Sequence, residues 1–197
     1  MTKPFSQACE NNRDPILKAL MPILANRKSV LEIGSGTGQH AVWFGAHLDH
    51  LDWHTSDRIE NHRGIELWLA ENALINVHPP LVLDVIADPW PTAKFDAVFS
   101  ANTSHIMSWQ EVEAMFKLAS SLLFSDGVLC LYGPFRYGIE KMVSSNQDFD
   151  TRLKAEHSHQ GIRSFESLDE LACINKLVFL EDKALPANNR LLAWQKA

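Results

Sequence analysis

Residues 30–40 read Val30-Leu31-Glu32-Ile33-Gly34-Ser35-Gly36-Thr37-Gly38-Gln39-His40. An apolar run followed by a glycine-rich turn and a helical pattern is typical of a buried strand, a tight loop and a helix N-terminus. Glycine at alternate positions lets the backbone approach a ligand closely, and the helix directs free N–H groups toward that ligand. The segment therefore predicts a small-molecule site at one edge of a sheet.

One acid distinguishes this loop from loops that bind phosphates. Glu32 lies two residues before the first glycine, where a carboxylate repels phosphate but favours a ligand that carries ammonium and sulfonium groups. A dinucleotide site requires the spacing Gly-x-Gly-x-x-Gly, and a P-loop requires Gly-Lys-Ser/Thr; neither is present. We therefore expect S-adenosylmethionine as the cofactor.

Strand and helix patterns alternate along the rest of the chain. Strands are predicted near residues 29–33, 51–56, 81–83, 95–99, 128–132, 178–181 and 190–194. The last two are close in sequence and are joined by Pro186-Ala187-Asn188-Asn189, which favours a hairpin and an antiparallel last strand. The predicted fold class is therefore α/β: a doubly wound, mostly parallel seven-stranded sheet with an antiparallel last strand, Rossmann-like and of the class I methyltransferase type.

Helix boundaries are predicted from capping residues. Ser108 with Glu111, and Ser167 with Glu170, have the spacing of capping boxes. Asp14 and Pro15 are expected to start the first helix, and Pro22 to kink or end it. With 197 residues, the chain is expected to form a single domain over 1–197, with a helical segment at 1–27 and a lid-like insertion at 134–163.

Composition narrows the expected partners. The formal net charge is -6 without a Lys/Arg run, so no nucleic-acid partner is expected. Cys9, Cys130 and Cys173 are widely separated, so neither a disulfide framework nor a metal site is expected. No signal-peptide pattern and no apolar stretch of ~20 residues is present, so we expect a cytoplasmic protein without a membrane partner. The pattern specifies no oligomeric state.

The expected cofactor site combines the glycine loop with polar residues at successive strand ends. Asp57 is placed to accept bonds from ribose hydroxyls, and Asp84 from the adenine amine. Arg58 and Val85 are expected to flank the adenine, and Asn102 to lie near the methionine end. The complete set of expected cofactor contacts is Glu32, Gly34, Ser35, Gly36, Gly38, Gln39, Asp57, Arg58, Asp84, Val85 and Asn102.

The chain also resembles, over nearly its full length, a domain-of-unknown-function family of small methyltransferase-like proteins with bacterial and animal members. The motifs that carry the resemblance are Asn11-Asn12-Arg13-Asp14-Pro15-Ile16-Leu17, residues 31–40, Ser56-Asp57, residues 80–85, residues 101–106, Tyr132-Gly133-Pro134-Phe135, residues 145–150, Gly161-Ile162-Arg163 and residues 186–189. The family tends to have Arg-Asn-Arg where this chain has Asn11-Asn12-Arg13. The resemblance implies the fold and the cofactor, but supplies no substrate.

Candidates for chemistry and substrate binding lie outside the glycine loop. His105 is the candidate general base, and Tyr132 is a candidate for orienting the substrate; local hydrogen bonding and packing are the structural alternatives. Polar residues near the chain start, in the insertion and in the hairpin are expected to line an acceptor pocket: Asn12, Arg13, Asn146, Arg163 and Asn188. Arg13 or Arg163 is expected to bind an anionic group of the substrate.

The function expected from these features is S-adenosylmethionine-dependent transfer of a methyl group to a small molecule. The run Ala101-Asn102-Thr103-Ser104 disfavours nucleic-acid amino-methylation, which uses an Asn/Asp-Pro-Pro-Tyr-type motif. Two alternatives remain open. One is a non-catalytic module that binds S-adenosylmethionine or S-adenosylhomocysteine, and the other is an NAD(P)-dependent oxidoreductase.

Overall fold

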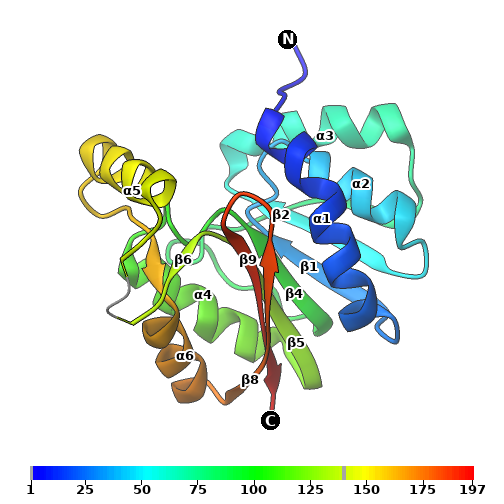
Figure 1. Ribbon diagram of the computed structural model, residues 1–197. Helices are drawn as coiled ribbons and strands as arrows, with labels where there is room; N and C mark the ends of the chain where they lie inside the picture. The colour runs from blue at the N-terminus through cyan, green and yellow to red at the C-terminus, as the bar shows by residue number, and fades with distance from the viewer. Residues whose placement is uncertain (1, 139–140) are drawn as a thin grey trace.

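A seven-stranded mixed sheet forms the centre of the molecule (Figure 1). The computed structural model describes residues 2–138 and 141–197. The strand order is β3-β2-β1-β4-β5-β9-β8. The strands are β1 Ser29–Ile33, β2 Asp52–Asp57, β3 Val77–Val82, β4 Phe95–Ala101, β5 Leu123–Gly133, β8 Leu177–Leu185 and β9 Asn189–Lys196.

Strand directions confirm the predicted fold class. β1 to β5 pair in parallel, whereas β9 is antiparallel to both of its neighbours, β5 and β8. The carboxyl ends of the five parallel strands therefore meet at one edge of the sheet, where open α/β sheets bind their ligands. A separate two-stranded sheet is formed by β6 Phe135–Arg136 and β7 Arg163–Ser164.

Helices cover both faces of the sheet (Figure 1). One face carries α1 Gln7–Leu24, α2 Gln39–His47 and α3 Ile59–Asn72. The other carries α4 Trp109–Leu122 and α6 Phe165–Ile174, with α5 Ser144–Glu156 beyond them. No helix among the described residues combines the length and the apolar character needed to cross a membrane.

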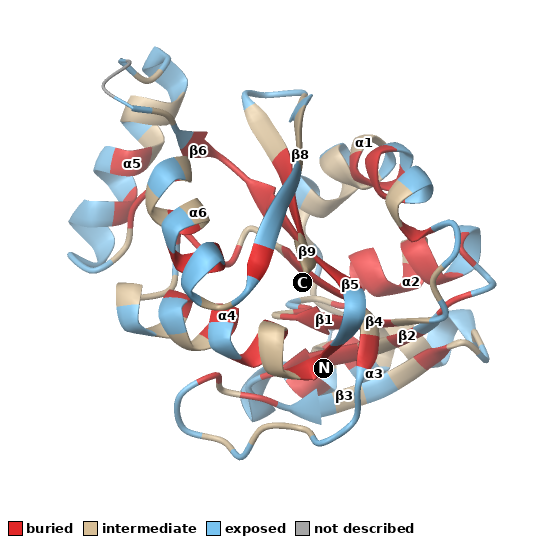
Figure 2. Cartoon of the chain, turned by 90° about the horizontal axis from the view of Figure 1, so that it is seen from below, coloured by how far each residue is buried: buried red, intermediate tan, exposed pale blue. Residues whose placement is uncertain are grey.

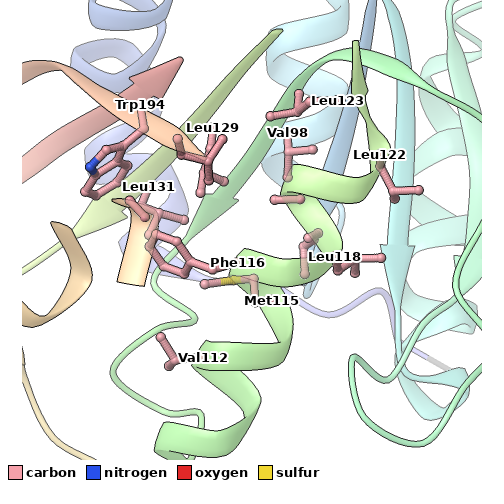
Figure 3. Packing of buried hydrophobic residues seen from close by; sticks show 14 of the residues in the cluster. Val98, Val112, Met115, Phe116, Leu118, Leu122, Leu123, Leu129, Leu131 and Trp194 are labelled. Carbon is pink, nitrogen blue, oxygen red and sulfur yellow. The ribbon is translucent and has the colours of Figure 1, made fainter. Parts of the chain in front are cut away.

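Alternating residues of the central strands feed two separate cores. Val30 packs with Ile16 and Phe44 beneath α1 and α2, whereas the next residue, Leu31, packs with Phe116 beneath α4. This period of two is what a sheet buried on both faces requires. Figure 2 shows the buried residues concentrated on the sheet and on the inner sides of the helices, and Figure 3 shows the core beneath α4.

The predicted start of the first helix is wrong. The helix α1 begins at Gln7, where the Ser6 hydroxyl accepts a bond of 3.3 Å from the Cys9 backbone N–H, and it continues through Pro15 and Pro22 to Leu24. Each proline removes one backbone donor. The buried stripe formed by Ile16, Leu17, Ala19, Leu20 and Leu24 holds the helix against the core despite this loss.

Further boundaries differ from those predicted: β5 starts at Leu123 rather than near residue 128, and β8 ends at Leu185 rather than near residue 181. The N-cap of α6 is Ser164, which accepts a bond from the Ser167 N–H, so Ser167 lies inside the helix. Strand β3 starts at Val77 rather than near residue 81, and includes Pro79 and Pro80. Because β3 is an edge strand, a proline without an N–H donor is tolerated there.

The predicted capping box of α4 is confirmed and supports a stability prediction. The Ser108 hydroxyl accepts from the Glu111 N–H at 3.3 Å, and Glu111 Oε2 accepts from the Ser108 N–H at 2.6 Å. We expect Ser108→Ala to lower the free energy of unfolding by about 1 kcal/mol because the cap is lost. Urea denaturation measures this, with the exposed Ser158→Ala as control; an equal loss in both variants would contradict the capping role.

Candidate functional site

The glycine loop is fixed against the end of β2. The backbone N–H groups of Gly34 and Ser35 both donate to the Ser56 carbonyl at 3.0 Å, and the Gly36 N–H donates to Asp57 Oδ2 at 2.7 Å. The neighbouring strand β4 also holds the loop, because the Ser100 hydroxyl donates to the Ile33 carbonyl at 2.7 Å. The turn is therefore preorganised by the strands on both sides of β1.

The three glycines serve different purposes. A Cβ on Gly34 would lie 2.5 Å from Thr103 Cγ2, and a Cβ on Gly38 would lie 3.0 Å from Ile65 Cα, so both positions are required for packing. Gly36, with a φ of +57°, has no heavy atom within 4 Å of the same point. The backbone of Gly36 is therefore the part of the loop that a ligand can approach most closely.

Two cavities meet above this loop. The first, here called the carboxylate cavity, has a volume of about 900 Å³, and its lining includes Asp57, Glu60, Asp84 and Glu111. The second, the amide cavity, has a volume of about 660 Å³ and six asparagines in its lining: Asn11, Asn12, Asn102, Asn146, Asn188 and Asn189. Gly34, Gly36, Ala101 and Asn102 line both cavities, so the two adjoin at the carboxyl ends of β1 and β4.

Asp57, the last residue of β2, lines the carboxylate cavity. Its Oδ1 accepts bonds from the Arg58 N–H at 2.7 Å and from the Asn61 side-chain amide at 2.8 Å. Its Oδ2 accepts from Gly36 N–H, which leaves a lone pair on this oxygen for a further donor. A hydroxyl-bearing ligand above the loop fits this acceptor.

Asp84 lies two residues beyond the end of β3 and pairs with Arg58. Arg58 Nε is 3.3 Å from Asp84 Oδ2, and Arg58 Nη2 donates to Glu111 Oε1 at 3.0 Å. The backbone N–H groups of Ile86 and Ala87, with the charge of Arg58, hold the pKa of Asp84 below its usual value, although burial opposes this. Arg58, Asp84 and Val85 all line the carboxylate cavity, as expected for one binding site.

Glu32 is not where the electrostatic argument placed it. Its carboxylate is buried beneath the loop, where it accepts bonds from the Ser35 hydroxyl at 2.8 Å and from Trp53 Nε1 at 3.2 Å, and it lines neither cavity. Burial raises the pKa of Glu32 to about 7, against the lowering effect of these two hydrogen bonds. Glu32 therefore supports the loop through Ser35, and the negative lining comes from the four acids of the carboxylate cavity.

Gln39 also lines neither cavity, and its side chain instead connects two helices. Its Oε1 accepts from the Ser6 N–H at 2.5 Å, and its Nε2 donates to Glu10 Oε1 at 2.8 Å. These bonds join α1 to the start of α2, beside the glycine loop. Gly38 likewise lines neither cavity and forms the N-cap of α2.

The amide cavity is enclosed by three segments that lie outside the doubly wound core. Helix α1 supplies Ala8, Cys9, Asn11, Asn12 and Pro15 to its lining. Helix α5 supplies Ser145, Asn146 and Phe149, and the turn between β8 and β9 supplies residues 186–189. Figure 1 shows this turn between α1 and α5, above the carboxyl ends of the strands. Asn188 Nδ2 donates to Ser145 Oγ at 3.3 Å, which connects the turn to α5.

His105 lines the amide cavity and is 5% exposed. Within the described residues, its buried Nδ1 has no hydrogen-bond partner. Burial, together with the charge of Arg163, lowers the pKa of His105 to about 4, so the ring is neutral near pH 7. A neutral imidazole with an uncommitted nitrogen is suited to accept a proton from a bound molecule.

Tyr132, at the end of β5, also lines the amide cavity, and burial raises the pKa of its hydroxyl. The nearby side chains of Asn12 and Asn189 have the opposite, smaller effect on this pKa. Asn12 Oδ1 lies 2.7 Å from His40 Nε2, which links the lining of α1 to α2. Asn12, Asn146 and Asn188, which are predicted to bind the substrate, all line this cavity.

The two arginines expected to bind an anion do not line the amide cavity. Arg13 pairs with Glu10 at 2.7 Å, and its guanidinium lies 3.9 Å from the centre of the Trp43 ring. Arg163 donates to the carbonyls of Ser104, Met107 and His159. These contacts occupy both guanidinium groups, and Arg163 stabilises the loop that carries His105.

Some residues of the site were missed in the sequence. Three of them hydrogen-bond to residues already described: His40 to Asn12, Asn61 to Asp57, and Trp53 to Glu32. A fourth, Phe149, packs edge-on against His105, with 5.2 Å between the ring centroids. Asn61 follows Asp57 by four residues at the start of a helix, a spacing that predicts this contact. For Trp53 and Phe149 no local signal exists, because their contacts depend on tertiary packing.

The residues fit S-adenosylmethionine in kind. Gly36 leaves open space for the ligand, Asp57 Oδ2 keeps a free lone pair for a ribose hydroxyl, and the adjoining carboxylates suit a cationic ligand. His105, whose buried Nδ1 has no partner among the described residues, lines the adjoining amide cavity, where an acceptor molecule would bind. Among the described residues, no group of three His, Cys, Asp or Glu is placed to hold a metal ion.

Comparison with solved structures assigns the fold to the class I methyltransferases. The mitomycin 7-O-methyltransferase MmcR matches with a TM-score of 0.85 at 14% identity, over 96% of this chain and 54% of that one. Human N-acetylserotonin methyltransferase matches with a TM-score of 0.81 at 14% identity, over 97% of this chain and 53% of that one. An O-methyltransferase family protein from Burkholderia thailandensis matches with a TM-score of 0.78 at 13% identity, over 96% and 60% of the two chains.

The chain thus spans somewhat more than half the length of these methyltransferases. Its sequence matches the family described as "Protein of unknown function (DUF938)" over residues 3–196. The protein belongs to this DUF938 family.

Proposed function

We propose that the protein transfers the methyl group of S-adenosylmethionine to a small-molecule acceptor. The observation that carries this proposal is the meeting of two cavities at Gly36 and Asn102, one lined by carboxylates and one by amides. A methyl donor in the first cavity and an acceptor in the second would approach each other at that junction. The similar structures support the proposal because they include two O-methyltransferases and a methyltransferase solved in complex with SAM.

Each side of the site has a defined part in this reaction. S-adenosylmethionine, when bound, supplies an electrophilic methyl group on its sulfonium. Asp57 and Asp84 would hold the nucleoside through hydrogen bonds, and the backbone at Gly36 gives it room. His105 would take the proton of the acceptor, while Tyr132 orients it from the end of β5.

Calorimetry with S-adenosylmethionine, S-adenosylhomocysteine and NAD(H) tests the cofactor assignment. We expect heat of binding with the first two ligands and none with NAD(H). The absence of binding by both sulfur compounds would overturn the proposal. Binding of NAD(H) alone would favour an oxidoreductase, and cofactor binding without turnover of any acceptor would favour a non-catalytic module.

A matched pair of substitutions on β2 tests the site itself. Asp57→Asn removes the charge at the carboxyl end of the strand, and we expect the affinity for S-adenosylhomocysteine to fall about tenfold or more, because a hydrogen bond to a charged group is lost. Asp52→Asn, at the exposed opposite end of the same strand, is the control and should retain the affinity. An equal effect of both substitutions would contradict the placement of the ligand.

A further inference from the structure

The described lining of the amide cavity contains no Asp, Glu, Lys or Arg. Its polar side chains are those of the six asparagines, of His40 and His105, and of the hydroxyl-bearing residues Ser6, Ser35, Thr37, Tyr132 and Ser145. Burial is the main cause that lowers the pKa of both histidines to about 4, so they are uncharged near pH 7. A bound molecule would therefore meet a polar but uncharged wall.

Charged acceptors are disfavoured by this lining. Arg13 and Arg163, the cations expected from the sequence to bind an anion, have other partners. Arg13 contacts Glu10 and Trp43, and Arg163 donates to three carbonyl groups. An anion in the cavity would lose its hydration without gaining an ion pair, and the same holds for a cation, because no carboxylate lines the described wall. An asparagine amide offers both a donor and an acceptor, which matches hydroxyl and amide groups.

The orphaned nitrogen of His105 adds a specific requirement. A Cβ built on Gly133 would lie 3.7 Å from both His105 Nδ1 and Asn102 Oδ1, so these two polar atoms face one small space beside the glycine. His105 is 5% exposed, and within the described residues its Nδ1 lacks a partner. A hydroxyl group of a ligand would satisfy this nitrogen by a hydrogen bond, because a hydroxyl can both donate and accept.

We infer that the acceptor is an uncharged molecule that presents a hydroxyl group to His105 and further hydroxyl or amide groups to the asparagines of the amide cavity. This inference rests on the proposed methyl transfer and adds the chemical class of the acceptor. Phe149, which packs edge-on against the His105 ring, gives the same cavity apolar surface for a ring, together with Pro134 and Pro186.

The transfer balances without another reactant. The acceptor oxygen forms a bond to the methyl carbon while the sulfonium C–S bond breaks, and the sulfur keeps the electron pair. The hydroxyl proton passes to the neutral ring of His105, which releases it to solvent after the products leave. The products are a methyl ether and S-adenosylhomocysteine.

A matched pair of probes tests the charge preference by binding alone. The protein is first saturated with S-adenosylhomocysteine, and 4-hydroxybenzamide or 4-hydroxybenzoate is then added at neutral pH. These probes share a phenol ring and differ in the charge of one group. The ring resonance of His105 in an NMR spectrum, assigned by its loss in His105→Gln, reports occupancy of the amide cavity. We expect 4-hydroxybenzamide to shift this resonance with at least tenfold higher affinity.

An equal or stronger response to 4-hydroxybenzoate, or no response to either probe, would overturn the inference. Asn146→Lys places a cation in the lining at α5 and should reverse the preference, whereas Asn72→Lys on the exposed surface of α3 should leave it unchanged. Failure of S-adenosylhomocysteine to bind in the first step would instead contradict the proposed function. The two failures are therefore distinguishable.

Turnover provides an independent readout. A metabolite extract from the source organism is separated by ion exchange into neutral, anionic and cationic fractions, and each is incubated with methyl-labelled S-adenosylmethionine. We expect labelled product from the neutral fraction. Label from the anionic or cationic fraction alone, or from none despite intact cofactor binding, would contradict the inferred class of acceptor.

Discussion

Replacement of His105 by glutamine is expected to lower turnover by about 100-fold or more, because general-base catalysis contributes at least that factor. Glutamine keeps a polar group of similar length but cannot take up the acceptor's proton. The affinity for S-adenosylhomocysteine should remain unchanged, because His105 lines only the amide cavity. Turnover is measured with the fraction of the metabolite extract that yields methyl-labelled product. Calorimetry measures the affinity for S-adenosylhomocysteine.

The pH profile separates catalysis from positioning. Because the pKa of His105 is lowered to about 4, turnover of the wild-type protein should rise as pH increases through about 4 and then reach a plateau. The His105→Gln variant should lack this rise. His50→Gln, on an exposed histidine outside both cavities, is the control. A fall in turnover with an unchanged profile would assign His105 a positioning role only.

The second large effect concerns stability at Glu32. Burial raises its pKa from 4.5 to about 7, and the charge of Asp57 adds to the shift. Between pH 4.5 and about pH 7, the Glu32 carboxyl is protonated in the native protein but ionised in the unfolded chain. The contribution of this protonated carboxyl to stability is therefore complete below pH 4.5. It is lost as pH rises through 7. The shift corresponds to about 3 kcal/mol in the free energy of unfolding.

We therefore expect Glu32→Gln to gain stability relative to the wild-type protein by about 3 kcal/mol between pH 4.5 and pH 8. Urea denaturation across this range measures the difference between the two proteins. All other ionisable groups are common to the two proteins and cancel in the difference. Glu60→Gln, exposed on α3, is the control; a difference that is independent of pH for Glu32→Gln would contradict the buried proton.

Local patterns in the sequence predicted those parts of the site that lie at strand ends. The lining of the carboxylate cavity includes Gly36, Asp57 and Asp84, because the carboxyl ends of parallel strands meet at one edge of the sheet. The strand alternation likewise predicted the sheet and its antiparallel last strand.

The errors arose where a side chain can turn toward several neighbours. Glu32 was expected to face the ligand, but Trp53 from β2 and Ser35 draw its carboxylate beneath the loop. Arg163 was expected to bind an anion, but its guanidinium donates hydrogen bonds to carbonyls of a loop about 60 residues earlier in the sequence. No spacing rule reports such contacts, because they form only when the elements pack.

The bonds from Gln39 to Ser6 and Glu10 have a practical consequence for handling the protein. They bring Ser6 and Cys9 into the wall of the amide cavity. An affinity handle joined directly to Ser6 would therefore lie beside this cavity. The strand β9 ends at Lys196 on the opposite edge of the sheet, where Figure 1 shows the C-terminus. A handle attached there lies away from the cavity, so binding and turnover assays are best made with that version.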